Sequence, residues 1–471
     1  MKLNLSTNDY LIIIAYFVAV LVIGFKTKTS DNSVKDYIIA GRTLTLPAFV
    51  ATLVSSFYGG VLGIGEFTYS FGISGWLLYA FPFYFFITIF ALFLADKVRK
   101  AHLYTIPDKL NRIYGKKVSI FGAILIFFLT TPAPYLFMMA ILMKLIFGFN
   151  ILYAMIVSLA LSILYLLKGG LRADVRVNIF EFILMFVGFG IILPFCFNIL
   201  GGYEFLEARL PPQHLSITGG FTIQYFFVWF FIGAWALIDP VFYQRCYAVK
   251  NKKTPKIGVL ISLFFWFIFD AMTTITGLYS KAYFGNDLTE PLYSFPALGE
   301  KILPPIAKSV FLVGMIATIM SSLHSYIFVS STTFSRDILG RIKNIDDDKF
   351  LYRGTGLLVS AVFALLIAKL IPSVVEIWYT VGTIIIPALL ISVVTSYYPK
   401  LHVHSKYIFA AMIASSSVSL LCFLTGQILS LNGTPRYPLG IEPMYPGLVI
   451  GLIIYFIGYS KRKYLVVESD Y

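Results

Sequence analysis

Thirteen apolar segments follow one another along almost the whole chain. Most are long enough for a helix to cross the hydrocarbon core of a bilayer, and the connections between them are short. Every backbone polar group in hydrocarbon must be satisfied internally, which favours helices. With 58% hydrophobic and 13% charged residues, an ordinary soluble domain is excluded. The sequence therefore predicts an all-α polytopic membrane protein with about 13 transmembrane helices. The segments lie at approximately 10–25, 44–71, 73–95, 118–147, 151–167, 177–200, 220–243, 257–280, 305–335, 354–371, 373–398, 407–430 and 445–460.

Lysine and arginine residues gather in alternate connections. Most of the 37 fall on the side that holds 97–117, 245–256 and 336–353 when thirteen spans are counted. Basic connections are retained in the cytoplasm. We therefore expect a multi-pass protein of the plasma (inner) membrane, with its N-terminus outside and its C-terminus cytoplasmic. This topology accounts for the net charge of +14, so we expect no nucleic-acid partner.

One apolar segment carries a polar stripe. Thr318, Ser321, Ser322 and Ser325 recur at helical spacing within 305–335. A hydroxyl without a partner is costly in hydrocarbon, so the stripe should face protein, water or an ion. Taken alone, it is more often explained by bonds back to the same helix or by close helix packing.

Two other segments contain residues that interrupt a membrane helix. These are Gly59, Gly60, Gly63 and Gly65 in 44–71, and Gly233, Asp239 and Pro240 in 220–243. Unwound backbone at membrane depth is tolerated where its carbonyls meet protein, water or an ion. Interrupted helices in corresponding positions of two halves indicate the substrate site of a secondary transporter.

The two interruptions divide the chain into units. A first five-helix repeat would occupy 44–200 and a second 201–398, and the odd number of spans inverts one repeat relative to the other. Residues 1–43 would hold an extra helix and a basic cytoplasmic loop. Residues 399–471 would hold two further helices and a short cytoplasmic tail.

Seven short motifs occur in order along the chain. They are Asp36–Arg42 (DYIIAGR), Ala51-Thr52 with Ser55, Thr105–Asp108 (TIPD), Gly169–Ala173 (GGLRA), Gln244-Arg245, Met320-Ser321-Ser322, and Ser331-Thr332 with Asp337-Ile338. In this order and spacing the chain resembles the sodium:solute symporter family. The resemblance implies a LeuT-like 5+5 inverted-repeat core and sodium-coupled symport of a small polar organic solute by alternating access. We expect a monomer working in the lipid bilayer.

The resemblance also implies a sodium site. The conserved site of the family would take backbone carbonyls of Ala51, Val54 and Thr318 and the hydroxyls of Ser321 and Ser322. Five oxygens without a carboxylate suit weak, reversible binding of a hard monovalent cation. Na+ is therefore the expected coupling ion, and an ion site now becomes the better explanation of the polar stripe.

A second sodium site, which some members possess, is expected to be missing. Those members place an Asp on the fifth core helix where this chain has Asn178, and a hydroxyl where it has His324. The role of Glu181 stays open between a proton-binding group, a packed neutral acid and a partner of Arg172 or Arg176.

The substrate cavity of the family lies between the first, third, sixth, eighth and tenth core helices. The candidate lining residues are Ser55, Ser56, Phe57, Tyr58, Tyr135, Trp229 and Trp235. Any single one of these aromatics is more often a packing residue. Glu66, Asp239 and Lys144 have no assigned role. The third core helix has no Arg to pair a substrate carboxylate, and sugar, amino acid, monocarboxylate, nucleoside and vitamin all remain open.

A solute sensor, an uncoupled or proton-coupled transporter and an enzyme are the alternatives to sodium-coupled symport. A solute sensor needs a signalling domain, whereas the tail after Ser460 has only eleven residues. An uncoupled or proton-coupled transporter stays open. An enzyme needs clustered catalytic groups, and along the sequence the five His form no cluster with acids. We therefore expect a transporter and not an enzyme.

Overall fold

The computed structural model describes residues 2–29, 33–219, 221–345, 353–431 and 435–462. Within these ranges the chain is almost wholly helical, and an isolated β-bridge joins Leu44 to Val249. Ten helices are long and apolar enough to cross a membrane, and a bent pair makes eleven. Two shorter apolar helices, α10 (Ile151–Ile163) and α22 (Met444–Ser460), occupy the places of the other two expected spans. The all-α polytopic prediction is confirmed. Most of the predicted tail, 463–471, lies outside the described residues.

The continuous spans agree with the apolar segments in position. They are α1 (Thr7–Lys26), α5 (Ser74–Ile89) continued by a π-helical turn and α6 (Ala95–Lys100), α8 (Lys116–Leu129) followed by α9 (Ala133–Phe147), α11 (Leu166–Leu200), α15 (Thr254–Phe284), α17 (Pro305–Thr332), α19 (Arg353–Leu370), α20 (Val374–Ser396) and α21 (Ser405–Ile428). Short helices connect them, including α2 (Val34–Ile39), α7 (Ile106–Tyr114), α12 (Tyr203–Arg209), α16 (Ser294–Ile302) and α18 (Arg341–Lys343).

Both predicted interruptions are present. The first separates α3 (Leu46–Phe57) from α4 (Val61–Phe71), and the two helices meet at 56°. The second separates α13 (Ile223–Ile232) from α14 (Pro240–Ala248) by a 3₁₀ turn. Asp239 begins α14 by accepting a 2.7 Å hydrogen bond from the backbone N–H of Val241, and Pro240 suits the first helical position. Glycine and proline therefore break the helices where the sequence indicated.

The long helices α11 and α17 pack against each other along the interior. They touch at two glycines, because a Cβ placed on Gly188 would lie 2.5 Å from the Cα of Gly314. The predicted span begins at 177, whereas α11 already begins at Leu166. Gly170 interrupts it with φ +50° and ψ −143°, a conformation that glycine tolerates best.

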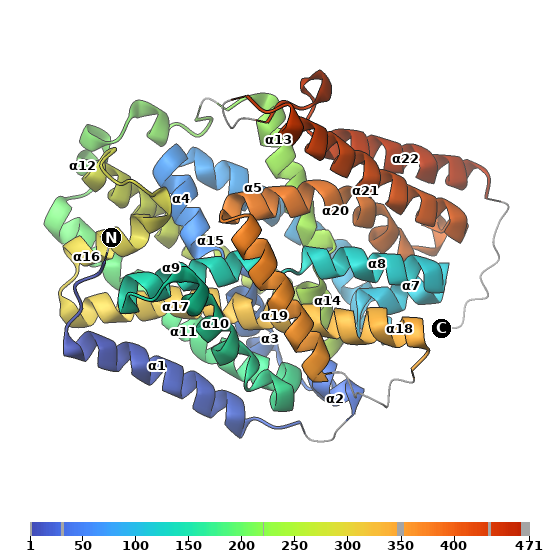
Figure 1. The fold of residues 1–471 in the computed structure, drawn as a ribbon, viewed down its shortest axis with the longest axis horizontal. Helices are drawn as coiled ribbons and strands as arrows, with labels where there is room; N and C mark the ends of the chain where they lie inside the picture. The colour runs from blue at the N-terminus through green and yellow to red at the C-terminus, as the bar shows by residue number, and fades with distance from the viewer. Residues whose placement is uncertain (1, 30–32, 220, 346–352, 432–434, 463–471) are drawn as a thin grey trace.

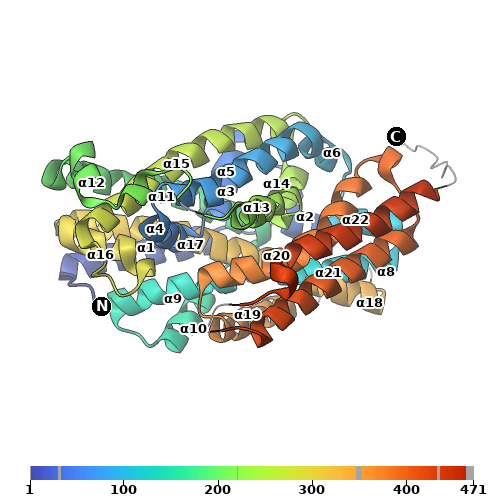
Figure 2. The same ribbon diagram turned by 90° about the horizontal axis from the view of Figure 1, so that it is seen from above.

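Most helices run along the long axis of the molecule (Figure 1). In that view α1 begins at the left end and α22 ends at the right end. The last two helices, α21 and α22, lie at one edge, and α20 lies between them and the rest of the bundle (Figure 2). The broken helix α3–α4 is interior, with α17 and α11 against one side and α15 against another.

Candidate ion and solute sites

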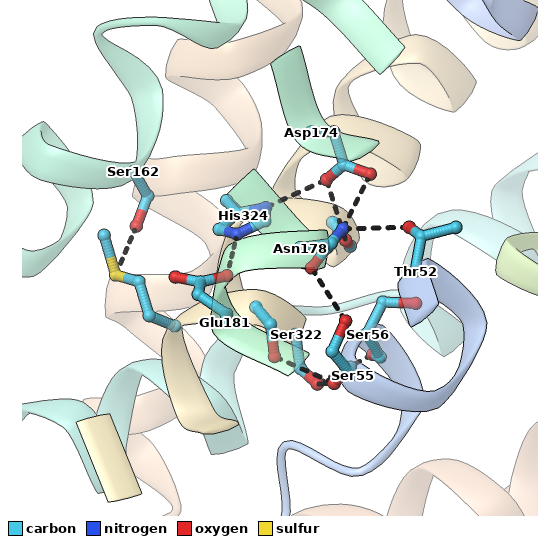
Figure 3. Close-up of polar contacts among 12 residues, drawn as sticks. Thr52, Ser55, Ser56, Ser162, Asp174, Asn178, Glu181, Ser322 and His324 are labelled. Atoms are coloured by element: carbon cyan, nitrogen blue, oxygen red, sulfur yellow. Dashed lines mark hydrogen bonds and ion pairs between the residues drawn. The ribbon is translucent and has the colours of Figure 1, made fainter. Parts of the chain in front are cut away.

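The end of α3 meets α17 through hydroxyl-to-carbonyl hydrogen bonds. Ser321 Oγ donates to the carbonyls of Ser55 and Thr318, both at 2.8 Å. Ser322 Oγ donates to the carbonyl of Ser56 at 2.7 Å. Both serines are fully buried, and Figure 3 shows Ser322 directed at the end of α3. The polar stripe therefore faces a second helix at its break.

The other predicted sodium ligands lie at the same junction. The carbonyl of Ala51 accepts a 2.9 Å bond from Ser55 Oγ, and the carbonyl of Val54 accepts a 3.2 Å bond from Trp266 Nε1 of α15. A carbonyl oxygen has two lone pairs, so the Val54 carbonyl keeps capacity for an ion beside its Trp266 bond. The Ala51 carbonyl lies within α3 and also accepts the helical N–H of Ser55, so an ion there would replace the Ser55 hydroxyl bond. The Thr318 hydroxyl donates to the Gly314 carbonyl of its own helix at 2.6 Å.

Beside this junction lies a fully buried chain of charged groups. Arg245 Nη2 of α14 lies 2.6 Å from Asp174 Oδ2 of α11. The His324 imidazole lies between two carboxylates, 2.9 Å from Asp174 Oδ1 and 2.9 Å from Glu181 Oε2. Tyr16 of α1 donates to the other Glu181 oxygen at 2.7 Å. Four helices are joined by this chain.

The five His form no cluster with acids along the sequence, but the fold brings His324 between two acids. No local sequence pattern indicates this cluster, because His324 is 150 positions from Asp174 and 143 from Glu181. A neutral imidazole donates through one nitrogen, so two carboxylate contacts require either an imidazolium or a protonated carboxyl. Glu181 therefore belongs to this cluster and pairs with neither Arg172 nor Arg176, which bond to Asp36 and Thr27 respectively.

Asn178 turns its amide group into the same region (Figure 3). Its Nδ2 lies 3.1 Å from each of three acceptors, on Thr52, Asp174 and Ser325. The Arg245 guanidinium also donates to Ser325 Oγ at 3.0 Å. The oxygens that would face a second cation therefore already accept bonds from an amide and from a fixed positive charge.

An aromatic cavity lies beside the breaks of both interrupted helices. It is small, about 30 Å³, which is room for one or two water molecules. Its lining residues are Phe57, Tyr79, Phe83, Tyr135, Trp229, Ile232, Trp235, Tyr326 and Trp378. Four predicted candidates, Phe57, Tyr135, Trp229 and Trp235, thus lie together. The sequence did not indicate the other lining residues. Most of them are aromatic, and aromatic residues occur in most spans.

A second cavity, called here the Asp270 cavity, shares Phe57, Tyr79 and Phe83 with the first. It measures about 20 Å³ and is completed by Tyr58, Ala80, Tyr84, Ile87, Trp266 and Asp270. The predicted residue Tyr58 lies here. Ser55 and Ser56 line neither cavity. The Ser55 hydroxyl faces the Ala51 carbonyl and Asn178, and the Ser56 hydroxyl is buried without a hydrogen-bond partner in the described part of the chain.

Three charged residues without an assigned role lie outside both linings. Asp239 stands directly behind the aromatic cavity, because its Oδ2 accepts a 2.6 Å bond from the Tyr326 hydroxyl. Lys144 is exposed in the last turn of α9. Glu66 is half-buried on α4. Of the three, Asp239 is connected directly to a lining residue.

The motifs and the fold agree with a known family. The model of the sodium:solute symporter family matches residues 37–400, more than three quarters of the chain. The chain belongs to the sodium:solute symporter family. Similar proteins include Solute carrier family 5 member 4A from Mus musculus, 25% identical over 76% of this chain and 63% of its own length. Sodium/glucose cotransporter 1 from Oryctolagus cuniculus is 25% identical over 74% of this chain and 60% of its own. The chain thus spans about 60% of the length of these relatives.

Solved structures support the fold assignment. A Na+-coupled sialic acid symporter in a substrate-bound outward-open state superposes with a TM-score of 0.80 at 14% identity, covering 97% of this chain and 98% of that one. Mhp1, a nucleobase-cation-symport-1 family transporter in a closed conformation, gives 0.56 at 14% identity, covering 90% and 94%. The LeuT-like fold predicted for this chain is confirmed.

Proposed function

We propose that this protein carries a small polar organic solute across the plasma (inner) membrane together with sodium, by alternating access. The observation that carries the proposal is the contact between Ser321 and Ser322 and the carbonyls at the broken end of α3. Membership of the symporter family supports it, as do relatives named as sodium/glucose cotransporters. The protein works as a monomer, with its N-terminus outside and its C-terminus cytoplasmic.

Sodium binding and the position of α3 are coupled in this proposal. In the described conformation the two hydroxyls donate protons to carbonyls of α3. An ion held by the carbonyls of Ala51, Val54 and Thr318 needs the oxygen lone pairs of the same hydroxyls, so their protons must turn away. The α3–α17 contact then passes from direct hydrogen bonds to bonds through the ion. This exchange gives sodium a differential affinity for two arrangements of the helices.

One sodium accompanies each solute. Asn178 and the Arg245 guanidinium direct N–H groups at the oxygens that a second sodium would need. Asp174 compensates the charge of this guanidinium, but the oxygens already accept these N–H bonds, which disfavours a second sodium. Family members with a second sodium site have an acid where this chain has Asn178. The contacts of Asn178 and Arg245 therefore support a stoichiometry of one sodium per solute.

A sodium titration of purified full-length protein tests the ion site. Thermal stability is measured as potassium chloride is replaced by sodium chloride at constant ionic strength. Loss of one ligand costs about 1–3 kcal/mol, so Ser321→Ala and Ser322→Ala should raise the apparent sodium constant roughly 5- to 150-fold. Ser158→Ala is the matched control, because the hydroxyl of that buried serine donates to the Ala154 carbonyl of its own helix. Unshifted curves for both Ser321→Ala and Ser322→Ala would defeat the proposed site.

A further inference from the structure

The walls of the two cavities are almost wholly aromatic and contain no positive charge. Every residue that lines the aromatic cavity is aromatic except Ile232. The lining of the Asp270 cavity adds Ala80, Ile87 and one carboxylate. Neither lining includes Lys, Arg or His. A solute carboxylate would lose its hydration there without gaining a counter-charge, so an anionic solute is disfavoured.

Asp270 is a carboxylate without a cationic partner among the described residues. It lies in the middle of α15, 4% exposed. The hydroxyls of Tyr58 and Tyr84 donate to its two oxygens, and the Tyr58 hydroxyl also lies 2.9 Å from Thr273 Oγ1. Hydroxyls satisfy its hydrogen-bonding capacity but do not neutralise its charge. Ionisable groups at this depth are normally paired and mark a transport pathway.

The chemistry of the walls also argues against a polyhydroxylated solute. Such a solute exposes many donors and acceptors, each of which needs a partner when it is buried. The aromatic cavity offers tyrosine hydroxyls and indole N–H groups, and its lining contains no amide or carboxylate side chain. In contrast, the faces of Trp and Tyr rings attract a cation, and cages of such rings recognise alkylated ammonium groups.

We propose that the solute is an organic cation with an alkylated ammonium group, held by the aromatic cavity and counterbalanced by Asp270. The inference rests on the proposed transport function and names its substrate class. Phe57 and Phe83 form walls of both cavities and stack edge to face with their ring centroids 5.4 Å apart. Rotation of these rings joins the two small cavities and brings the ammonium within reach of the carboxylate. The positive charge of the solute then supplies the counter-charge that Asp270 lacks.

Choline and its uncharged isostere 3,3-dimethyl-1-butanol test this proposal, because the two differ in charge and hardly in shape. Four of the five tryptophans, Trp229, Trp235, Trp266 and Trp378, line the cavities. Intrinsic fluorescence of the full-length protein in saturating sodium chloride therefore reports binding. We expect choline to bind at least tenfold more tightly than the alcohol. Equal binding, tighter binding of the alcohol, or no response to choline overturns the proposal.

Variants locate the counter-charge. Asp270→Asn should reduce the preference for choline to less than threefold, whereas Asp270→Glu should retain it. Asp287→Asn is the control, since it removes an exposed acid at the end of α15. An unchanged preference in Asp270→Asn overturns the role of Asp270. The wild-type comparison decides the substrate class even if Asp270→Asn does not fold.

The sodium titration separates the failure of this proposal from the failure of the proposed transport function. A shifted Ser321→Ala curve with no preference for choline refutes the substrate class alone. A flat sodium response of the wild-type protein refutes sodium coupling.

Discussion

Gly59 lies directly against Ser322. A Cβ added to Gly59 would stand 2.2 Å from both Cβ and Oγ of Ser322, and 2.9 Å from the Tyr135 ring. The break between α3 and α4 is therefore a place where backbone touches a predicted sodium ligand and a wall of the aromatic cavity. A side chain has no room there.

Gly59→Ala should push the end of α3 away from α17. We expect the apparent sodium constant to rise at least tenfold in the thermal-stability titration. Gly354→Ala is the matched control, because its Cβ would meet nothing within 4 Å in the first turn of α19. That change should leave the sodium curve in place and stabilise the protein by about 0.4–1 kcal/mol. A wild-type sodium curve in Gly59→Ala would contradict the close approach.

The buried Asp174–Arg245 pair should be costly to break from one side. Asp174→Ala leaves an uncompensated guanidinium and should destabilise the protein by about 3–5 kcal/mol. Replacing both charges, as in Asp174→Leu with Arg245→Met, should recover much of this loss. Thermal unfolding in detergent measures both effects.

Glu300→Ala serves as the control for that comparison. It removes the partner of Lys308 in a 3.0 Å pair whose side chains stay partly exposed. The expected cost is about 1 kcal/mol or less. A double variant no more stable than Asp174→Ala alone would show that the network, and not the isolated guanidinium, determines the loss.

Sodium should bind at one site per protein. The stability titration should therefore follow a single-site curve with a Hill coefficient of about one. A coefficient clearly above one would mean that a second sodium binds despite the N–H groups of Asn178 and Arg245. Repeating the titration with Asn178→Asp shows whether an acid at this position raises the coefficient.

Membrane topology follows from the sorting of basic residues. A reporter fused after Tyr471 should be active in the cytoplasm, and a tag placed before Met1 should be accessible from outside. The first residue of α1 and the last residue of α22 lie at opposite ends of the bundle, as an odd number of spans requires (Figure 1). An external C-terminal reporter would refute the thirteen-span arrangement.

The sequence was sufficient for the spans and for the two breaks because both depend on local chemistry. Apolar length specifies a membrane helix, and the glycines at 59 and 60 or the Asp239-Pro240 pair interrupt one wherever the helix lies. The stripe of Ser321 and Ser322 was readable for the same reason, since helical spacing places both on one face.

Partners distant in sequence were not readable. His324 meets its two acids across more than 140 positions, and no local pattern connects them. The sequence does not single out Tyr326 or Trp378 as lining residues. Aromatic residues are abundant in this chain, with 45 Phe and 31 Tyr, so aromatic identity does not distinguish a cavity wall from a lipid-facing surface. Asp270 stands alone in an apolar helix, and its intramembrane position was the signal that could have identified it.

The glycine contact between α11 and α17 has a mechanical consequence for the transport cycle. At Gly188 and Gly314 the two backbones touch without an intervening layer of side chains that could repack. Protein interiors resist continuous deformation, and such a seam offers no alternative arrangement. About two turns further along α17, Ser321 meets α3 through a hydroxyl bond to the Ser55 carbonyl. Such a bond can break and re-form without repacking of side chains. We therefore expect α11 and α17 to move as one body in the proposed transport cycle, and the broken helix α3–α4 to move relative to that pair.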